Sequence, residues 1–264
     1  MSDTNWSVDY DQIAATYDKR YERNQYAEVE QTLLQFVTSE PGLQILEVGC
    51  GTGHWLAILH RRGHQVIGLD LSAQMLDRAH SLVPDVPLIR GRAEHLPLPS
   101  ETFDRVFCIN AIHHFADKPA FIEEVRRLLR PHGSFLSVGL DPHAESDQWY
   151  VYDYFPESIE IDKQRYPAAS SLREWMHDAG FEACTTREAE HWIVRLPARE
   201  ILKQGRLEKT ATSQLAVLTD QQYRRGMQRI HDDIERLEEK GEELFLASDL
   251  RLYETTGSVA KRPR

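Results

Sequence analysis

Short apolar runs alternate with amphipathic stretches between residues 43 and 140, and this alternation constrains the fold more than any other feature of the sequence. The first run, Leu43-Gln-Ile-Leu-Glu-Val48, has the length and residue types of a buried strand and ends at a glycine. A stretch with apolar residues at helical spacing follows and stops at Gly63, as helices commonly end at a glycine. We therefore expect a strand, a turn and a helix in this order.

The same alternation recurs from residue 64 to residue 140. Further strands are expected at 64–70, 86–90, 103–109 and 134–140, and helices at 72–81 and 117–129, with a Pro131-His-Gly133 turn before the last strand. Strands joined through helices form a parallel sheet covered on both faces, because the crossover connections are right-handed. The expected fold is therefore α/β, a doubly wound, mostly parallel sheet whose ligands bind at the carboxyl ends of the strands.

Outside this core the pattern predicts additional elements. We expect a helix at 170–179, a strand at 181–189 and a final strand at 243–254, which would add an antiparallel edge strand to the sheet. The expected organisation is an N-terminal helical lid (1–40), a core (41–192), a helical cap insertion (193–242) and a final strand with a tail (243–264). In the insertion, Ile230, Ile234 and Leu237 form one apolar stripe on a charged helix, which either caps a ligand or covers a sheet edge.

Residues 148–156 contain five aromatic side chains in nine positions, too many for a solvated loop. They either line an apolar acceptor pocket or fill the space between the core and the insertion. We favour the pocket.

Charge and composition exclude several classes of function. The 31 Lys and Arg residues against 42 Asp and Glu give a net charge of −11, which disfavours a broad nucleic-acid interface. No run approaches the roughly 18–20 apolar residues of a membrane span, and the first residues lack the pattern of a signal peptide. The three cysteines have neither disulfide nor zinc spacing, and no histidines are arranged as metal ligands. We expect a cytoplasmic protein with reduced thiols, without metal, nucleic-acid or membrane partners, and of unknown oligomeric state.

The run Glu47-Val-Gly49-Cys-Gly51-Thr-Gly53 lies between the first expected strand and helix. Glycines let the backbone approach a ligand closely, and the following helix presents free amides. Asp70 ends the second expected strand 21 residues after Gly49, where a carboxylate can accept hydrogen bonds from both ribose hydroxyls. The turn and the acid together predict a nucleoside site.

Two residues distinguish this site from a dinucleotide site. The third glycine of a G-x-G-x-x-G turn would stand at position 54, which is His54. Glu47 would repel a pyrophosphate but attract an ammonium or sulfonium. The expected ligand is cationic and free of phosphate.

The stretch from ILEVGCGTG to DLSAQMLDRAH resembles the cofactor site of class I S-adenosylmethionine-dependent methyltransferases, and is similar to the ubiquinone/menaquinone-biosynthesis-like group. Three further segments are similar to that family, namely YDQIAATYDKRY, GRAEHLP and FDRVFCINAIHHFADKPAFIEEVRRLLRPHGSFL. Arg92 departs from the family, which usually has an acid there that accepts from the adenine amino group. Arginine has only donors, so Glu94, water or backbone must take that contact.

The resemblance implies S-adenosyl-L-methionine as cofactor and roles for individual residues. Gly49, Gly51 and Gly53 would admit the methionine moiety, Glu47 would orient its polar end, Asp70 would hold the ribose, and Leu71 and Met75 would enclose the adenine. Tyr10 and Tyr17 would close over the methionine end. The remaining expected cofactor contacts are Ala93, Glu94 and Asn110.

The expected activity is methyl transfer to a small, largely apolar or aromatic acceptor. Such a displacement depends mainly on holding the acceptor close and aligned. Where the acceptor must lose a proton, His113 and His114 are the candidate bases, although they can equally serve as helix-start residues. Two alternatives stay open, a non-catalytic S-adenosylmethionine-binding sensor or scaffold and a nicotinamide-dependent oxidoreductase.

Overall fold

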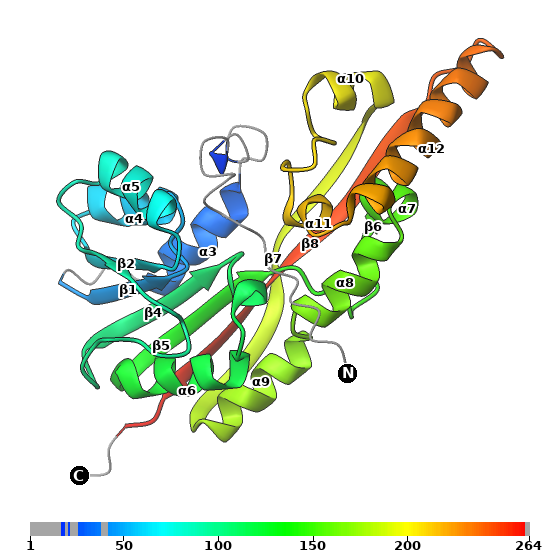
Figure 1. Ribbon diagram of the computed structural model, residues 1–264. Helices are drawn as coiled ribbons and strands as arrows, with labels where there is room; N and C mark the ends of the chain where they lie inside the picture. The colour runs from blue at the N-terminus through cyan, green and yellow to red at the C-terminus, as the bar shows by residue number, and fades with distance from the viewer. Residues whose placement is uncertain (1–16, 19–20, 22–25, 38–41, 262–264) are drawn as a thin grey trace. The chain divides into compact units, whose positions relative to one another are not determined.

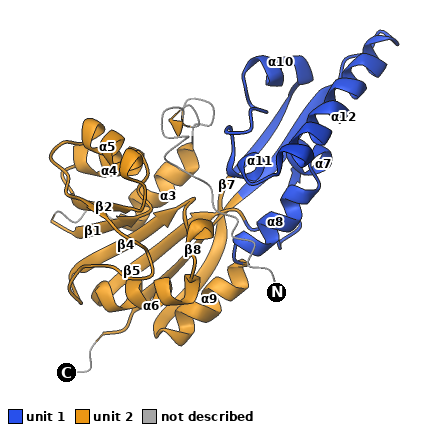
Figure 2. Ribbon diagram, viewed as in Figure 1, with its two compact units in different colours: residues 1–8, 141–167, 191–251 blue, residues 9–140, 168–190, 252–264 orange. Residues whose placement is uncertain are grey.

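The computed structural model describes residues 17, 18, 21, 26–37 and 42–261. Most of the expected lid, including Tyr10, lies outside the described residues. The chain divides into two compact units (Figure 2): unit 1 comprises 1–8, 141–167 and 191–251, and unit 2 comprises 9–140, 168–190 and 252–264. The expected cap insertion lies within unit 1, together with residues 141–167.

One sheet of eight strands has the order β3-β2-β1-β4-β5-β8-β6, and β7 pairs with β8 (Figure 1). The strands are β1 (Gln44–Val48), β2 (Gln65–Asp70), β3 (Leu88–Arg90), β4 (Phe103–Ile109), β5 (Leu129–Gly139), β6 (Gln148–Trp149), β7 (Phe181–Pro197) and β8 (Phe245–Val259). Strands β1 to β5 pair in parallel, whereas β8 is antiparallel to β5 and β6. The predicted fold class is confirmed.

Helices cover both faces of the sheet in unit 2. They are α3 (Ala27–Val37), α4 (His54–Arg61), α5 (Ala73–Leu82), α6 (Lys118–Leu128) and α9 (Ala169–Asp178). Figure 1 shows α3, α4 and α5 on one side of the sheet and α6 and α9 on the other. Phe121 of α6 and Met176 of α9 pack into one core with Phe135 of β5 and Phe181 of β7.

Two local features differ from the sequence expectation. The Pro131–Gly133 turn lies inside β5, because Leu129 pairs with Phe103 and Ser134 with Arg105, so the residues between them bulge from the ladder. The strand expected at 181–189 continues to Pro197, so the first residues of the expected insertion are strand.

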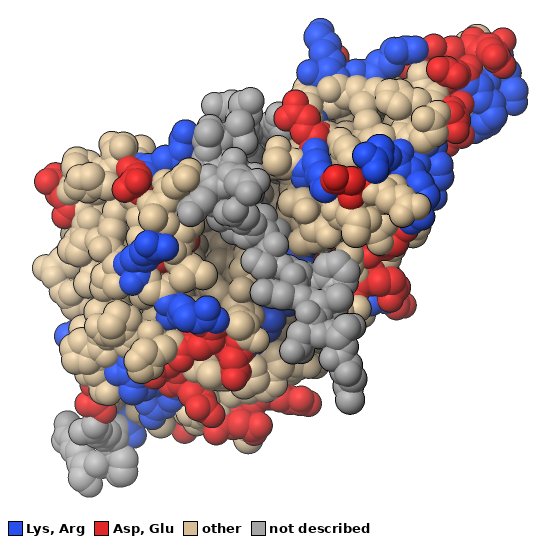
Figure 3. Space-filling view, viewed as in Figure 1, with Lys and Arg blue, Asp and Glu red and all other residues tan. Residues whose placement is uncertain are grey.

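Unit 1 contains α7 (Tyr150–Tyr154), α8 (Glu157–Arg165), α10 (Ala198–Lys203), α11 (Ser213–Ala216) and α12 (Asp220–Glu238). Ile230 and Ile234, two of the three residues of the expected stripe on α12, are buried against Val151 and Phe155. Figure 3 shows charged side chains of both signs along α12, consistent with the ion pairs Arg199–Glu238 and Arg236–Asp233. No helix in the described part of the chain is long and apolar enough to span a membrane.

Candidate functional site

The glycine-rich turn between β1 and α4 is built for close backbone approach. Gly49 has φ of 78°, and its amide donates to the carbonyl of Leu69 over 2.7 Å. A Cβ added to Gly49 would lie 2.4 Å from the Cβ of Ala111, so only glycine fits. Gly51 and Gly53 also have positive φ, as the sequence pattern predicts.

Asp70, at the carboxyl end of β2, holds this turn in place. Its Oδ2 accepts from the Gly51 amide over 2.8 Å, and its Oδ1 accepts from the Ser72 amide over 2.9 Å. Each carboxylate oxygen can accept more than one hydrogen bond, so a carboxylate at this place can accept from ligand hydroxyls as well as from backbone amides. The structure therefore joins the two predicted parts of the site directly.

Glu47 lies one strand away, paired in register with Gly68 of β2. Its side chain is only 1% exposed, and its Oε2 has no hydrogen-bond partner among the described residues. Burial, reinforced by the charge of Asp70, raises the pKa of this carboxyl well above its usual value. A buried acceptor without a donor is costly, which fits a ligand that brings an ammonium group.

The residues expected around the adenine differ in exposure. Leu71 is 57% exposed, although it is a large apolar residue, whereas Met75 and Ala93 are buried. Glu94 is already engaged, because its Oε1 accepts from the Ala116 amide over 2.5 Å and its Oε2 lies 3.4 Å from Nε of Arg92. An exposed leucine beside a carboxylate is available for stacking on a base.

The remaining expected site residues, Asn110, His113 and His114, lie in the segment directly after β4. Asn110 has φ of 51°, an unusual conformation for a residue with a side chain. Its backbone amide donates to the backbone carbonyl of Val138 over 2.8 Å. His113 is buried and His114 half-buried, with ring centroids 3.8 Å apart. No sequence signal indicated the left-handed backbone of Asn110, and conformations of this kind cluster at functional sites.

Aromatic side chains border the turn, and the sequence indicated only one of them. Tyr17 lies 3.7 Å from the position that a Cβ on Gly51 would occupy. Tyr21 stacks on His54 with ring centroids 3.8 Å apart and planes 6° apart. Tyr26 and Trp55 meet edge to face at 6.2 Å. The long sequence separation between these residues hides the contacts from any local pattern.

The described residues offer neither a reactive thiol in the glycine turn nor a metal site. Burial raises the pKa of the Cys50 thiol, with the charges of Glu47 and Asp70 adding to the effect, so it stays protonated and unreactive. Within the described ranges, no three His, Cys, Asp or Glu side chains gather as metal ligands would.

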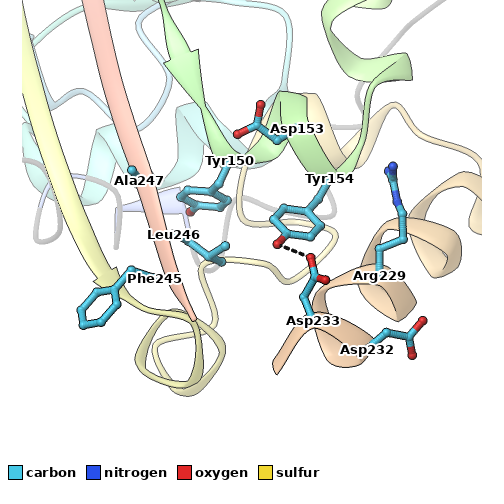
Figure 4. A pocket seen from close by; sticks show the side chains of 9 residues that line it. All are labelled: Tyr150, Asp153, Tyr154, Arg229, Asp232, Asp233, Phe245, Leu246 and Ala247. Atoms are coloured by element: carbon cyan, nitrogen blue, oxygen red, sulfur yellow. Dashed lines mark hydrogen bonds between the residues drawn. The ribbon is translucent and has the colours of Figure 1, made fainter. Parts of the chain in front are cut away.

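The aromatic run 148–156 lies in unit 1, where its side chains pack in the core and line a cavity. Trp149, Val151 and Phe155 belong to the core of this unit. Tyr150, which also belongs to this core, lines a cavity of about 600 Å³ together with Asp153 and Tyr154 (Figure 4). Its other lining residues are Arg229, Asp232, Asp233, Phe245, Leu246 and Ala247.

Polar contacts fix one wall of this cavity. The Tyr154 hydroxyl donates to Oδ2 of Asp233 over 2.8 Å (Figure 4). Arg236 donates to Oδ1 of the same aspartate over 2.6 Å. Burial and the Asp233 carboxylate raise the pKa of Tyr154 to about 12. The cavity thus combines aromatic and apolar surface with charges of both signs.

Comparison with known proteins gives consistent relatives. A family described as "Methyltransferase domain" matches residues 46–137. The uncharacterized methyltransferase YcgJ of Bacillus subtilis (strain 168) is 30% identical over 190 residues, which are 68% of this chain and 73% of that protein. The phthiotriol/phenolphthiotriol dimycocerosates methyltransferase of Mycobacterium leprae (strain TN) is 36% identical over 137 residues, 50% of each chain. The alignment thus spans half the length of this second relative.

A solved structure extends the likeness to nearly the whole fold. A protein from an antibiotic biosynthesis pathway of Anabaena variabilis ATCC 29413, described as a methyltransferase, superposes with a TM-score of 0.66 at 21% identity. The superposition covers 88% of this chain and 96% of that chain. At this identity the likeness concerns the fold alone.

Proposed function

Since this chain belongs to the class I S-adenosylmethionine-dependent methyltransferases, we propose that it methylates a small, largely apolar or aromatic metabolite. Family membership, predicted from the sequence motifs, is thereby confirmed. The cofactor is S-adenosyl-L-methionine, which supplies a methyl group bonded to a positively charged sulfur. The acceptor and the residues that serve it belong to the proposal.

The observation that carries the assignment of residues is the buried Oε2 of Glu47 beside the glycine turn, which has no hydrogen-bond partner in the part of the chain that the structure describes. In the proposed arrangement Glu47 receives the ammonium of the methionine moiety, and Gly49, Gly51 and Gly53 let that moiety approach the backbone. Asp70, at the carboxyl end of β2, accepts hydrogen bonds from the ribose hydroxyls. The close fit of Gly49 against Ala111 leaves no room for a side chain in this cradle.

Other residues enclose the remainder of the cofactor in this proposal. Leu71 contacts the adenine from its exposed position, with Met75 supporting it from the core. Ala93, Glu94, Asn110 and Tyr17 complete the cofactor contacts.

The chain contributes to the reaction by alignment and by exclusion of water. Attack on a methyl group proceeds in line with the departing sulfur, so orientation and desolvation account for much of the acceleration. His113 and His114 accept a proton where the acceptor must lose one. Their position after β4, at the carboxyl edge of the parallel strands, supports this role.

The cavity of unit 1 supports an acceptor with an aromatic or apolar body. Its volume of about 600 Å³ falls within the range of small-molecule sites. Tyr150, Tyr154 and Leu246 offer aromatic and apolar surface for a ring, and the charged side chains of the lining offer partners for polar substituents. Expected acceptors are therefore phenols and similar ring compounds. When the methyl group of the cofactor is labelled, we expect the label to appear in extractable aromatic compounds. Labelling of polar acceptors alone would contradict this acceptor class.

Cofactor binding is tested by calorimetric titration with S-adenosylhomocysteine. We expect saturable binding by the wild type and by Asp77→Ala, an exposed position on α5. Asp70→Ala should weaken binding by roughly tenfold or more, since a hydrogen bond to a charged group contributes about 1.5–3 kcal/mol. Absence of binding by the wild type would contradict the proposed function, and equal binding by Asp70→Ala would contradict the role of Asp70.

A further inference from the structure

Helix α3 begins at Ala27, directly after Tyr26. The carbonyl of Tyr26 accepts the first helical hydrogen bond from Glu30 over 2.9 Å. Tyrosine does not supply the short side-chain acceptor that Ser, Thr, Asn or Asp supplies at this position. Tyr26 also has φ of 44°, which is strained for a bulky residue. Something else must hold this helix start in place.

Glu190 of β7 caps the start of this helix from more than 160 residues away in the chain. Its Oε2 accepts from the amide of Glu28 over 2.9 Å and from the amide of Val29 over 3.0 Å. The Glu190 side chain is buried, with 6% exposure. A carboxylate at this end also interacts favourably with the helix dipole. The contact therefore fixes both the position and the direction of α3.

A chain of aromatic contacts connects the capped end to the glycine turn. Tyr26 lies 5.7 Å from Tyr21 and meets Trp55 edge to face, as measured between ring centroids. Tyr21 in turn stacks on His54. His54 and Trp55 are the first two residues of α4, directly after Gly53. Tyr21 and Tyr26, called here the aromatic wall, thus border the cofactor turn.

We propose that Glu190 is a positioning residue for cofactor binding, which acts by capping α3 and thereby holding the aromatic wall against His54 and Trp55. The inference rests on the proposed function, because it takes the glycine turn as the place where the cofactor binds. Glu190 itself touches no part of that turn in the described structure. Its effect passes through Tyr26, whose strained backbone the cap helps to maintain.

Loss of the cap should reduce the fraction of molecules in which the wall is in place. Apparent affinity falls in proportion to the fraction of the binding-competent form. Since loss of a cap corresponds to about a three- to thirtyfold change in an equilibrium, the dissociation constant for S-adenosylhomocysteine should rise by a similar factor in Glu190→Ala. Glu190→Gln keeps an acceptor oxygen without the charge, so an intermediate rise is expected.

The test measures the dissociation constant of S-adenosylhomocysteine by calorimetry, at a temperature well below the melting point of every variant. The matched control is Glu182→Gln, an exposed glutamate on the same strand, which should bind like the wild type. If Glu190→Gln and Glu190→Ala melt earlier but bind with the wild-type constant, the cap is merely structural and the proposal is wrong.

A double-mutant cycle with Tyr21→Ala distinguishes action through the wall from a general loosening of the site. If Glu190 acts through the wall, Glu190→Ala should weaken binding much less in the Tyr21→Ala background than in the wild type. Equal weakening in both backgrounds would overturn the proposal. Failure of the wild type to bind is a separate outcome that overturns the proposed function, so the two failures are distinguishable.

Discussion

The backbone amide of Gly51 donates a hydrogen bond to Oδ2 of Asp70 over 2.8 Å. This contact ties the glycine turn after β1 to the acid at the end of β2 before any ligand is bound. The Ser72 amide occupies the other carboxylate oxygen, so the orientation of Asp70 is fixed from both sides. A site held in this way is preorganised, which reduces the ordering that binding requires.

Replacement of Glu47 by glutamine should stabilise the free protein and weaken cofactor binding. Because burial raises the pKa of Glu47 in the folded state, the wild type loses stability relative to Glu47→Gln as pH rises above the usual glutamate value of 4.5. At pH 8 we expect the free energy of unfolding of Glu47→Gln to exceed that of the wild type by about 1 kcal/mol or more. Urea unfolding at pH 5 and pH 8 measures the difference.

The same variant should bind S-adenosylhomocysteine roughly tenfold or more weakly, because the amide cannot offer the ammonium a charged acceptor. A less stable variant at pH 8, or undiminished affinity, would contradict the role assigned to Glu47.

Asn110 should tolerate glycine but not alanine. Its φ of 51° is accessible to glycine without strain, whereas a Cβ in this region costs about 1–2 kcal/mol and alanine lacks the local hydrogen bonding of asparagine. We expect Asn110→Gly to melt close to the wild type and Asn110→Ala to melt several degrees lower. Calorimetric melting curves test this, and equal melting of the two variants would show that the backbone is not strained.

Gly226 should not tolerate alanine, although alanine is the better helix former by about 1 kcal/mol. A Cβ at this position of α12 would lie 2.1 Å from Cδ1 of Phe155, in the core of unit 1. Overpacking of this kind costs about 1–3 kcal/mol, so Gly226→Ala should destabilise the protein in urea. The smaller side chain in Phe155→Leu should reduce the cost in the double variant, and additive losses would contradict the clash.

The loss of stability caused by replacing Arg165 should depend strongly on pH, because Arg165 and Asp162 form a buried ion pair. Nη1 of Arg165 lies 3.3 Å from Oδ1 of Asp162, and both side chains are almost fully buried. Arg165→Met leaves Asp162 without its ion pair, which should cost about 3–5 kcal/mol at pH 8.

Burial raises the pKa of Asp162 to about 6 in the wild type, although the charge of Arg165 lowers it, so removal of Arg165 should raise this pKa further. The carboxyl of the variant is then protonated at pH 5, and the loss should be smaller there than at pH 8. Urea unfolding at both pH values tests this, with the exposed Arg199→Met as a control that should show no measurable change. A loss independent of pH would contradict the account.

The strand and helix pattern of unit 2 could be predicted from sequence because its signals are local. Strand β4 matches the predicted bounds. Ser72 and Asp117 cap the starts of their helices, a position that Ser and Asp commonly occupy. The length of β7 could not be predicted, since its residues beyond Ala189 join the sheet only through pairing with β8.

The candidate site divides in the same way. The glycine turn and Asp70 follow from spacing, whereas the Tyr21–His54 stack and the Glu190 cap join residues far apart in the chain. Oε2 of Glu47 is buried without a hydrogen-bond partner among the described residues, and no pattern of residue types in the sequence predicts this.

A crystal structure with S-adenosylhomocysteine bound is the most direct test of the central claim, that the glycine turn and the ends of β1 and β2 hold an adenosyl cofactor. The account predicts ribose hydroxyls within hydrogen-bond distance of Asp70 and the ammonium of the ligand beside Glu47. Density for the ligand elsewhere, or a ribose turned away from Asp70, would contradict it.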